Sequence, residues 1–229
     1  MWISVVIPAL NEEEPIAEVV REVIATRTPR EVIVVDNGST DQTAERARNE
    51  GARVVSAPRG YGRACAAGAA AVSDECDVLV FLDGDGSDVP HFIPALVEPI
   101  INGTYDFVIG SRTRGKRQAG SMNAQQIFAG HLAGLLIRTL YGVRYTDMCP
   151  FRAIRRDALA PLGMREQTYG WNLEMQMKGA RAGLRILEVP VDHRCRRGGE
   201  SKVSGTLRGT FVASFRILAT FLKIAFLGT

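Results

Sequence analysis

VLVFLDGDGSDVP, residues 78–90, is the stretch that decides the fold of this chain. Its first five residues are apolar, which is typical of a strand buried on both faces of a parallel sheet. The run ends abruptly at three carboxylates, Asp83, Asp85 and Asp88. Ligands of open α/β sheets bind at the carboxyl ends of the strands, so we expect these acids at the mouth of a site.

The spacing of two of these acids favours a hard cation. Asp83 and Asp85 are two positions apart, which in an extended segment directs both side chains to the same side. Mg²⁺ typically takes one or two protein carboxylates and completes its shell with water and phosphate oxygens, so the expected ligand is a nucleotide diphosphate. A solvated acidic turn is the alternative. An EF-hand does not fit, because its Gly and Glu positions hold Asp88 and Pro94.

The composition indicates one main globular domain with a C-terminal appendage. The chain has 229 residues, 46% of them hydrophobic and 23% charged. It has no C-x-x-C pair, which argues against a zinc site or a disulfide framework and for a reducing compartment. No basic leader precedes the first apolar segment, so we expect no signal peptide and a cytoplasmic location. The four cysteines are Cys65, Cys76, Cys149 and Cys195.

The net charge of +3 hides an asymmetry between the two halves. Residues 1–111 carry 8 Lys and Arg against 18 Asp and Glu, whereas residues 112–229 carry 20 against 7. This split predicts that an anionic partner meets the second half. With 7% aromatic residues and no recognisable nucleic-acid module, an anionic membrane surface or a phosphorylated substrate is favoured over nucleic acid.

Strands alternating with helices predict a mostly parallel sheet flanked by helices. The turn after the first strand lacks both G-x-G-x-x-G and the P-loop pattern, so neither a dinucleotide site nor a P-loop NTPase is supported. The expected strands, besides the acidic one, are residues 3–7, 31–35, 53–57 and 106–110.

Helix signals follow the first three strands. Asn11 is the expected N-cap of a first helix, and Ser39 or Thr40 that of a second helix closed by Gly51. A third helix from about Arg63 is rich in small residues, which favours close packing on the sheet. The apolar stripe of the first helix is Ile16, Val19, Val20, Val23 and Ile24.

Three basic or apolar segments have two interpretations each. Arg59 and Arg63 either flank a packed helix or face a phosphate. The glycine-rich basic loop at residues 110–120 either covers an anionic ligand or is solvated. A long helix at 123–141 is apolar on most of its surface, so we expect it to be buried or to lie against another apolar surface.

Seven sequence segments complete this pattern and span nearly the whole chain. They are VVIPALNEE (5–13), VVDNGSTD (34–41), FLDGDGSDVP (81–90), GSR (110–112), TDMCPFRA (146–153), GWNLEMQMK (170–178) and RGGESKVSGT (197–206). In this order they resemble the family 2 glycosyltransferases with a GT-A fold, within the dolichyl-phosphate mannose synthase-like or polyprenyl-phosphate glycosyltransferase branch.

The resemblance implies a nucleotide-sugar donor, UDP- or GDP-hexose, bound across the first half. Asp83 and Asp85, the D-x-D motif, would hold Mg²⁺ or Mn²⁺ on its diphosphate, which makes Asp85 a catalytic residue as well. Asp36 would contact the base or ribose, and Arg197 and Lys202 the donor or acceptor phosphates. Further substrate contacts are implied at Pro8, Asn11, Glu12, Arg63, Arg112, Arg152 and Ser201.

The chain departs from the family pattern at three places. Asn37 stands where a second Asp often follows Asp36, which leaves the base open. Gly86 and Ser87 replace the last two residues of D-A-D-L-Q, which weakens the case for GDP-mannose. The usual S-G-F-R is C-P-F-R, with cysteine and proline at 149 and 150.

The acceptor decides whether the reaction needs a base. Departure of the nucleoside diphosphate builds negative charge, which a divalent cation stabilises. A lipid phosphate acceptor is already anionic and needs no strong base, whereas a hydroxyl acceptor would need one, with Glu174 or Asp147 as candidates. Glu174 lies in a helix expected at 171–182, where a solvated helix charge is the alternative role.

The C-terminal segment predicts an amphipathic helix outside the main domain. Residues 207–227 place Arg208, Arg216 and Lys223 on one helix face and apolar side chains on the others. Such a helix lies in a membrane interface or packs on its own domain or on a partner in a homo-oligomer. We therefore expect a GT-A domain at 1–205 and a helix at 206–229. The histidines at 91, 131 and 193 lack metal-ligand spacing and are expected to be structural.

The resemblance implies an inverting, metal-dependent glycosyltransferase that moves a hexose to a polyprenyl phosphate, dolichyl or undecaprenyl, which we expect at the inner face of the cell membrane. Transfer to a soluble or other hydroxyl acceptor is the first alternative. A non-catalytic sugar-nucleotide or membrane-binding protein is the second. A nucleotidyltransferase is disfavoured, because its glycine-rich basic loop after the first strand is absent.

Overall fold

The structure is a computed structural model that describes residues 1–198 and 221–227. Its centre is a seven-stranded sheet in the order β3-β2-β1-β4-β6-β5-β7. β6 runs antiparallel to both of its neighbours, and the other pairs are parallel. The predicted mostly parallel α/β sheet is thus confirmed. The strands are β1 (Trp2–Ala9), β2 (Glu31–Asp36), β3 (Arg53–Ser56), β4 (Cys76–Phe81), β5 (Phe107–Ser111), β6 (Arg152–Arg155) and β7 (Ile186–Pro190).

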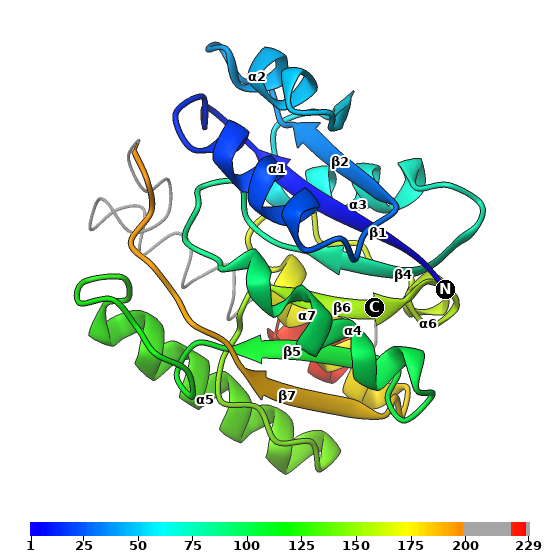
Figure 1. The fold of residues 1–229 in the computed structure, drawn as a ribbon. Helices are drawn as coiled ribbons and strands as arrows, with labels where there is room; N and C mark the ends of the chain where they lie inside the picture. The colour runs from blue at the N-terminus through cyan, green and yellow to red at the C-terminus, as the bar shows by residue number, and fades with distance from the viewer. Residues whose placement is uncertain (199–220, 228–229) are drawn as a thin grey trace.

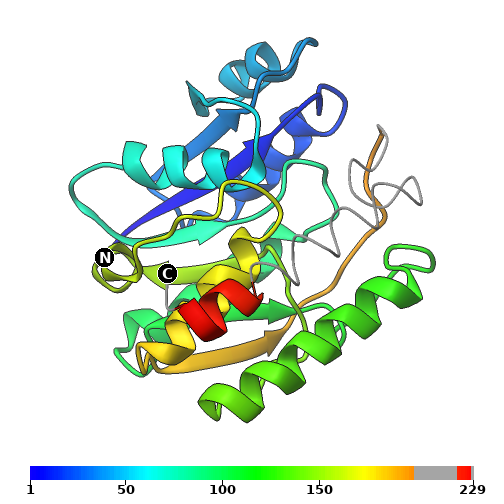
Figure 2. The ribbon, with the colours of Figure 1, turned by 180° about the vertical axis from the view of Figure 1, so that it is seen from behind.

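Helices cover both faces of the sheet. Figures 1 and 2 show α1 and α4 on one face and α3 and α7 on the other. Because both faces are covered, the central strands are continuous apolar runs, and Val78 and Val80 of β4 are fully buried. The helices are α1 (Ile16–Ala25), α2 (Thr43–Asn49), α3 (Tyr61–Ala71), η1 (Pro90–Phe92), α4 (Ile93–Ile101), α5 (Ala124–Tyr141), α6 (Arg156–Leu159), η2 (Ala160–Leu162), α7 (Trp171–Arg181) and η3 (Lys223–Leu227).

The strand register brings the predicted acids to one edge of the sheet. Ala9 at the end of β1 pairs with Asp36 at the end of β2, and Val6 pairs with Phe81 at the end of β4. β5 runs in the same direction as β4, since both are antiparallel to β6. The carboxyl ends of β1, β2, β4 and β5 therefore meet at one edge, as the sequence predicts for a ligand site.

The predicted N-caps of the first two helices are wrong. α1 begins at Ile16 with Pro15 in the N-cap position, because Asn11 adopts a left-handed backbone (φ 51°) and its Oδ1 accepts from the Thr40 amide instead. α2 begins at Thr43, beyond Ser39 and Thr40, since Asp41 Oδ1 accepts from the Thr43 amide and hydroxyl. Ile24 was expected in the apolar stripe but is 44% exposed.

Close packing of the small-residue helix is confirmed. α3 begins at Tyr61, slightly before the predicted start. A Cβ atom at Gly68 would lie 2.3 Å from Val6 Cγ1 and 2.9 Å from Val35 Cγ2, so only glycine fits where α3 crosses β1 and β2. This contact sets the height of α3 above the sheet and, with it, the place of Tyr61 at the site edge.

The long apolar helix is only partly buried. α5 starts with a capping box, in which Asn123 and Gln126 exchange side-chain to backbone hydrogen bonds. Its inner face packs closely on residues 145–147, because a Cβ at Gly134 would lie 2.1 Å from the Tyr145 carbonyl oxygen. The expectation of burial holds for this inner face alone. The outer face exposes Phe128, Leu132, Leu135 and Leu140.

The last described residues pack on the domain. Phe221 and Ile224 are buried, and Figure 2 shows η3 beside α7. The predicted boundary at 205 and residues 207–220 of the predicted amphipathic helix lie outside the described residues. Within the described ranges, no helix is both long and apolar enough to cross a membrane.

Candidate active site

The acidic loop after β4 is ordered by its own carboxylates. Asp88 Oδ2 accepts from the Asp83 amide at 3.0 Å, and Asp85 Oδ1 accepts from the Ser87 amide at 2.9 Å. Asp88 is only 2% exposed. A fully solvated acidic turn is therefore excluded, because one of its three carboxylates is buried and folds the loop around the other two.

The acidic loop has an excess of negative charge. Burial raises the pKa of Asp83 well above its usual range, and repulsion from Asp88 and Asp85 raises it further. Burial likewise raises the pKa of Asp88. Asp88 Oδ1 is buried without a hydrogen-bond partner among the described residues. A cation beside these carboxylates would relieve their repulsion, so the donor set fits a hard divalent ion.

The protein alone offers few ligands to such an ion. In residues 1–198 and 221–227, no group of three or more His, Cys, Asp or Glu side chains is arranged to hold a metal. Asp83 and Asp85 remain as a two-carboxylate donor set. This is the number that Mg²⁺ takes from a protein when substrate phosphates supply the rest of its shell.

An arginine-rich segment, residues 194–197, runs alongside the acidic loop after β7. The amide of Arg194 donates to the Ser87 carbonyl and that of Arg197 to the Asp85 carbonyl, both at 2.9 Å. The side chains of Arg194 and Arg197 pair with Glu22 and Glu18 of α1. The arginine-rich segment therefore ties the acidic loop to α1, and Arg197, an expected phosphate contact, is engaged by acidic side chains.

Arg196 is the arginine that points toward the acidic loop. Its Nη1 lies 3.7 Å from Asp85 Oδ2, and its Nη2 is 2.5 Å from Oε1 of Glu12, which is 7% exposed. The sequence motif predicts a phosphate contact at Arg197 and gives no indication of Arg196. The adjacent arginines give no signal of which one faces inward, because the direction of each side chain depends on how the segment pairs with the acidic loop.

His193 joins the acidic loop to the basic loop after β5. Its backbone forms one isolated β-bridge with Asp88 and another with Arg117. Burial and, to a smaller extent, the nearby Arg112 lower its pKa to about 4, so the imidazole is neutral at pH 7. These contacts agree with the expected structural role of this histidine.

The ends of β1 and β2 form the other side of the site. Asp36 Oδ1 accepts from the Ser39 amide at 3.0 Å, and Pro8 lies buried in β1. Asn37 Oδ1 accepts from the Gly60 amide at 3.0 Å. The departure at Asn37 therefore has a structural consequence, because the amide oxygen holds the loop that leads into α3.

Tyr61 links the acidic loop to a second loop, residues 165–167. Its hydroxyl donates to Asp83 Oδ1 at 2.9 Å. A Cβ at Gly62 would lie 2.1 Å from the Glu166 carbonyl oxygen, so α3 begins in close contact with this second loop. The Arg63 guanidinium donates to Gln167 Oε1 at 3.0 and 2.6 Å. No sequence motif indicates Tyr61, and Arg63, an expected substrate contact, holds the second loop here.

Glu174 anchors the same loop from beneath. It is 2% exposed, and its carboxylate accepts from the amides of Arg165 and Glu166 at 2.7–3.0 Å. Lys178 Nζ lies 2.8 Å from Glu174 Oε1. A solvated helix charge is thus excluded, and the carboxylate is satisfied by neighbouring donors.

Arg112 and Asp147 form an enclosed ion pair. Arg112 donates to both carboxylate oxygens of Asp147 at 2.8 Å, and its amide adds a bond of 2.9 Å. Burial alone would raise the pKa of Asp147, but Arg112 more than offsets this, and the pKa is lowered. Asp147 is 2% exposed.

Arg152 begins β6 opposite Phe81 at the ligand edge, but its side chain is engaged inside the protein, so the expected substrate contact stays a prediction. It is fully buried, and its guanidinium donates to the carbonyls of Cys149 and Asn172. Burial lowers its pKa. The R of C-P-F-R opens β6 and points into the core, a direction that the motif does not reveal. Ser201 and Lys202 lie outside the described residues.

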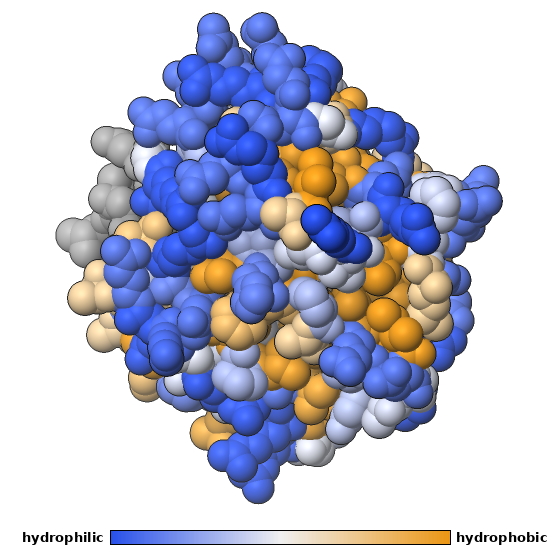
Figure 3. Space-filling model, viewed as in Figure 1, coloured by the Kyte–Doolittle hydropathy of each residue, from blue (hydrophilic) through white to orange (hydrophobic). Residues whose placement is uncertain are grey.

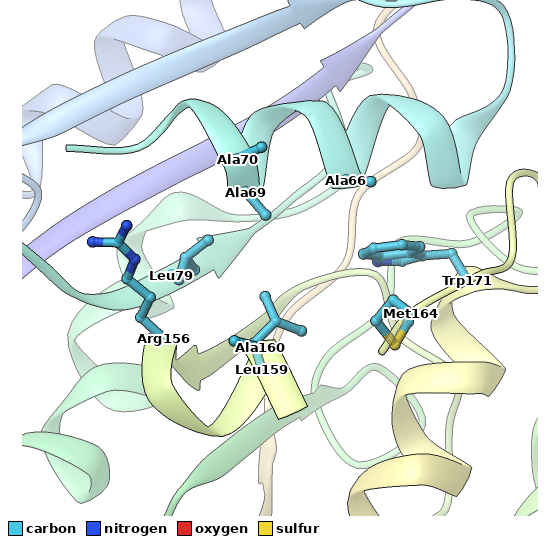
Figure 4. Close-up of a pocket in the computed structure, with 9 residues that line it drawn as sticks. All are labelled: Ala66, Ala69, Ala70, Leu79, Arg156, Leu159, Ala160, Met164 and Trp171. Carbon is cyan, nitrogen blue, oxygen red and sulfur yellow. The ribbon is translucent and has the colours of Figure 1, made fainter. Parts of the chain in front are cut away.

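A cavity of about 240 Å³ lies away from these residues, between α3 and the segment that contains α6 (Figure 4). It contains none of the predicted site residues. Figure 4 shows Arg156 at one end and Trp171 with Met164 at the other. The lining is Ala66, Ala69, Ala70, Leu79, Arg156, Leu159, Ala160, Met164 and Trp171.

Comparisons with known proteins agree with this geometry. The sequence profile of the family described as "Glycosyl transferase family 2" matches residues 4–163. An uncharacterised glycosyltransferase of Mycobacterium tuberculosis is 38% identical over 213 residues, covering 92% of this chain and 94% of the relative. A dolichyl-phosphate hexose transferase of Haloferax volcanii is 34% identical over 204 residues, covering 88% and 86%.

A solved structure is similar over almost the whole chain. It is glucosyl-3-phosphoglycerate synthase of Mycobacterium tuberculosis in complex with Mn²⁺, uridine diphosphate and glucosyl-3-phosphoglycerate. The TM-score is 0.79 at 29% sequence identity, with 98% of this chain and 80% of the other covered. The expected GT-A fold is confirmed by this match.

Proposed function

This chain belongs to glycosyl transferase family 2, and from that premise we propose that it moves a hexose from a nucleotide-diphosphate sugar to a polyprenyl phosphate with inversion. The observation that carries the proposal is the pair Asp83 and Asp85 at the ligand edge, where burial and neighbouring carboxylates raise the pKa of Asp83 and Arg196 lies 3.7 Å from Asp85. We assign residues 1–205 to the catalytic domain and 206–229 to an appended helix.

Donor binding follows from the two sides of the site edge. Asp36 and its neighbours at the ends of β1 and β2 would contact the nucleoside. Asp83 and Asp85 would hold Mg²⁺ or Mn²⁺ on the diphosphate; when bound, that ion stabilises the charge that develops on the leaving oxygens. Arg196, held by Glu12, would add positive charge beside the same phosphates. Tyr61 would keep the Asp83 carboxylate in one orientation.

A phosphate acceptor suits the state of the candidate bases. Glu174 already accepts amide hydrogen bonds and pairs with Lys178, and Asp147 is held by Arg112 with a lowered pKa. Neither carboxylate is poised to remove a proton. An anionic lipid phosphate needs no such base, and a relative named a dolichyl-phosphate hexose transferase supports this class of acceptor.

A soluble acceptor is the second candidate function. The similar solved structure contains glucosyl-3-phosphoglycerate, a soluble phosphorylated product, and its TM-score of 0.79 extends over nearly the whole chain. Both candidates share the donor chemistry and an acceptor with a phosphate group. They differ in whether the enzyme works at a membrane, and we propose a peripheral position at the inner face of the cell membrane.

Donor binding is the first test. Thermal shifts with UDP-glucose, GDP-mannose and related nucleotide sugars are measured with Mn²⁺ and with a chelator, on wild type, Asp85→Asn and the control Asp157→Asn. We expect a metal-dependent shift for one donor, which Asp85→Asn loses and the control keeps, because Asp157 lies at the surface with its side chain 67% exposed. Turnover in Asp85→Asn should fall by about 10²- to 10³-fold.

Two results would contradict the proposal. A folded wild-type protein that shifts with none of these donors refutes the donor assignment and favours a non-catalytic binding protein. A donor shift with sugar transfer to phosphoglycerate, but not to polyprenyl phosphate, supports the soluble acceptor instead.

A further inference from the structure

The outer face of α5 exposes more apolar surface than the fold requires. Phe128 is 68% exposed, Leu135 55%, Leu140 50% and Leu132 44%. Figures 1 and 2 both show α5 at the periphery of the molecule, with one side turned away from the sheet. Figure 3 shows that the region around α2 is hydrophilic, whereas hydrophobic residues reach the surface in the middle and lower parts of the view.

Three of these side chains form one continuous stripe. Phe128, Leu132 and Leu135 are spaced i, i+4, i+7 and fall within about 60° of one another around the helix. The opposite side of α5, with Gly130, Ala133, Gly134 and Ile137, is the side buried on the domain. A helix held by its inner face and its capping box does not need a second apolar face for its own stability.

The segment around this stripe contains no acidic residue and carries cations towards both of its ends. Residues 112–146 contain six Lys and Arg and no Asp or Glu. Arg112 and Arg114 face Asp147 and Glu188, but Lys116, Arg117, Arg138 and Arg144 are exposed and make no ion pair with the described part of the chain. Two of the four precede α5, and the other two lie in its last turn or just beyond it.

We propose that the outer face of α5, the stripe Phe128, Leu132 and Leu135, docks on the surface of an anionic lipid bilayer. A helix with an apolar stripe and flanking cations gains both from apolar insertion and from attraction to anionic headgroups. A second copy of the chain fits less well, since a two-fold contact would place this acid-free face against itself and bring like charges together. The proposal rests on the proposed lipid-phosphate acceptor and names the surface that meets its membrane.

Docking on this face brings the ligand edge close to the headgroups. The basic loop that leads into α5 is bonded to His193, because the Gln118 amide donates to the His193 carbonyl and the His193 amide donates to the Lys116 carbonyl. The backbone of His193 in turn forms a β-bridge with Asp88 of the acidic loop. A phosphate that stays in the headgroup layer therefore lies on the side from which the acidic loop is approached.

Vesicle binding of the full chain tests the surface. Co-sedimentation is measured with phosphatidylcholine vesicles and with vesicles of phosphatidylcholine and phosphatidylglycerol, at low and high salt. The stripe variant is Phe128→Ser with Leu132→Ser and Leu135→Ser, and the matched control is Ile24→Ser with Ile101→Ser, whose side chains are 44% and 43% exposed elsewhere. We expect at least tenfold weaker binding of the stripe variant to anionic vesicles and no change in the control.

The charge contribution is tested separately. Lys116→Gln with Arg117→Gln should reduce the preference for anionic over neutral vesicles several-fold and flatten the salt dependence. Equal binding of stripe variant, control and wild type overturns the proposal. A wild type that is dimeric by analytical ultracentrifugation, with a stripe variant that is monomeric and binds vesicles normally, also overturns it, by assigning the face to a second copy.

The same proteins distinguish this proposal from the proposed function. Donor shifts with Mn²⁺ are measured without lipid on the stripe variant, which should behave as wild type because the stripe faces away from the sheet. Normal donor shifts with unchanged vesicle binding refute the docking surface alone. Vesicle binding through α5 without any donor shift refutes the transferase proposal and leaves the docking surface standing.

Discussion

The carboxylates of the acidic loop and the buried carboxylates of Asp147 and Glu174 have opposite surroundings. Asp83, Asp85 and Asp88 lie against one another with an excess of negative charge, whereas Asp147 and Glu174 are each enclosed by donors and a cation. All come from motifs that the sequence marks as functional. The difference teaches that acids whose charge is already balanced hold the site together, while those whose charge is not balanced are available to a ligand.

The largest effect on stability is expected for Asp147→Asn. It leaves the Arg112 guanidinium, whose side chain is 15% exposed, without its anion. Removing one partner of a buried pair costs about 3 kcal/mol of unfolding free energy, or roughly 10 °C in melting temperature for a chain of this size. Asp157→Asn breaks a surface pair and should shift melting little. Normal melting with lost turnover would instead give Asp147 a chemical role.

The next largest effect on stability is expected for Glu174→Gln. This substitution distinguishes a structural role of Glu174, in holding the second loop, from a role as a general base. The neutral amide cannot accept from two backbone amides and pair with Lys178 as the carboxylate does, so we expect about 2 kcal/mol lower stability. Hydrogen exchange at residues 165–168 should speed up while other amides are unaffected. If melting and exchange stay as in wild type but kcat falls a hundredfold, Glu174 belongs with the reacting groups.

Tyr61→Phe tests the acidic side of the comparison. Loss of the hydroxyl frees the Asp83 carboxylate to rotate, and we expect about tenfold weaker Mn²⁺ binding, measured by titration calorimetry without donor. The control is Tyr145→Phe, whose hydroxyl is also buried but donates to the Gln176 carbonyl, away from the acidic loop. Identical Mn²⁺ affinities for the two variants would show that Tyr61 does not orient Asp83.

The smallest effect concerns Asp106, a balanced carboxylate near the surface. Hydrogen bonds from Arg185 lower its pKa from 3.8 to about 2, against the opposing effect of burial. A depressed carboxyl pKa stabilises the fold above the unfolded value, and this contribution is lost as the pH falls from 3.8 through about 2. The free energy of unfolding, measured with urea, should therefore fall more for wild type than for Asp106→Asn between pH 5 and pH 2. Parallel pH dependences for the two proteins would contradict this.

The central sheet and the ligand edge were predictable from the sequence. A continuous apolar run such as 78–82 is typical of a strand that is covered on both faces, because every side chain is then buried. Parallel strands bring their carboxyl ends together at one edge of the sheet. The order of motifs then indicated the family that the comparisons show. Helix starts were less accessible, because Asn11 and Thr40 bond to each other across the site rather than capping their own helices.

By itself the sequence determined that the strand at 78–82 is buried on both faces, that acids lie at the sheet edge, and that the chain divides into an acidic and a basic half. Only the tertiary structure decided which charged side chains remain available. The side chain of Arg152 is buried, and that of Arg197 pairs with Glu18 of α1. Arg196 lies beside Asp85 of the acidic loop, and the Tyr61 hydroxyl donates to Asp83. The physical reason is that apolar periodicity is local along the chain, whereas the balance of a charge depends on partners that folding brings from distant segments.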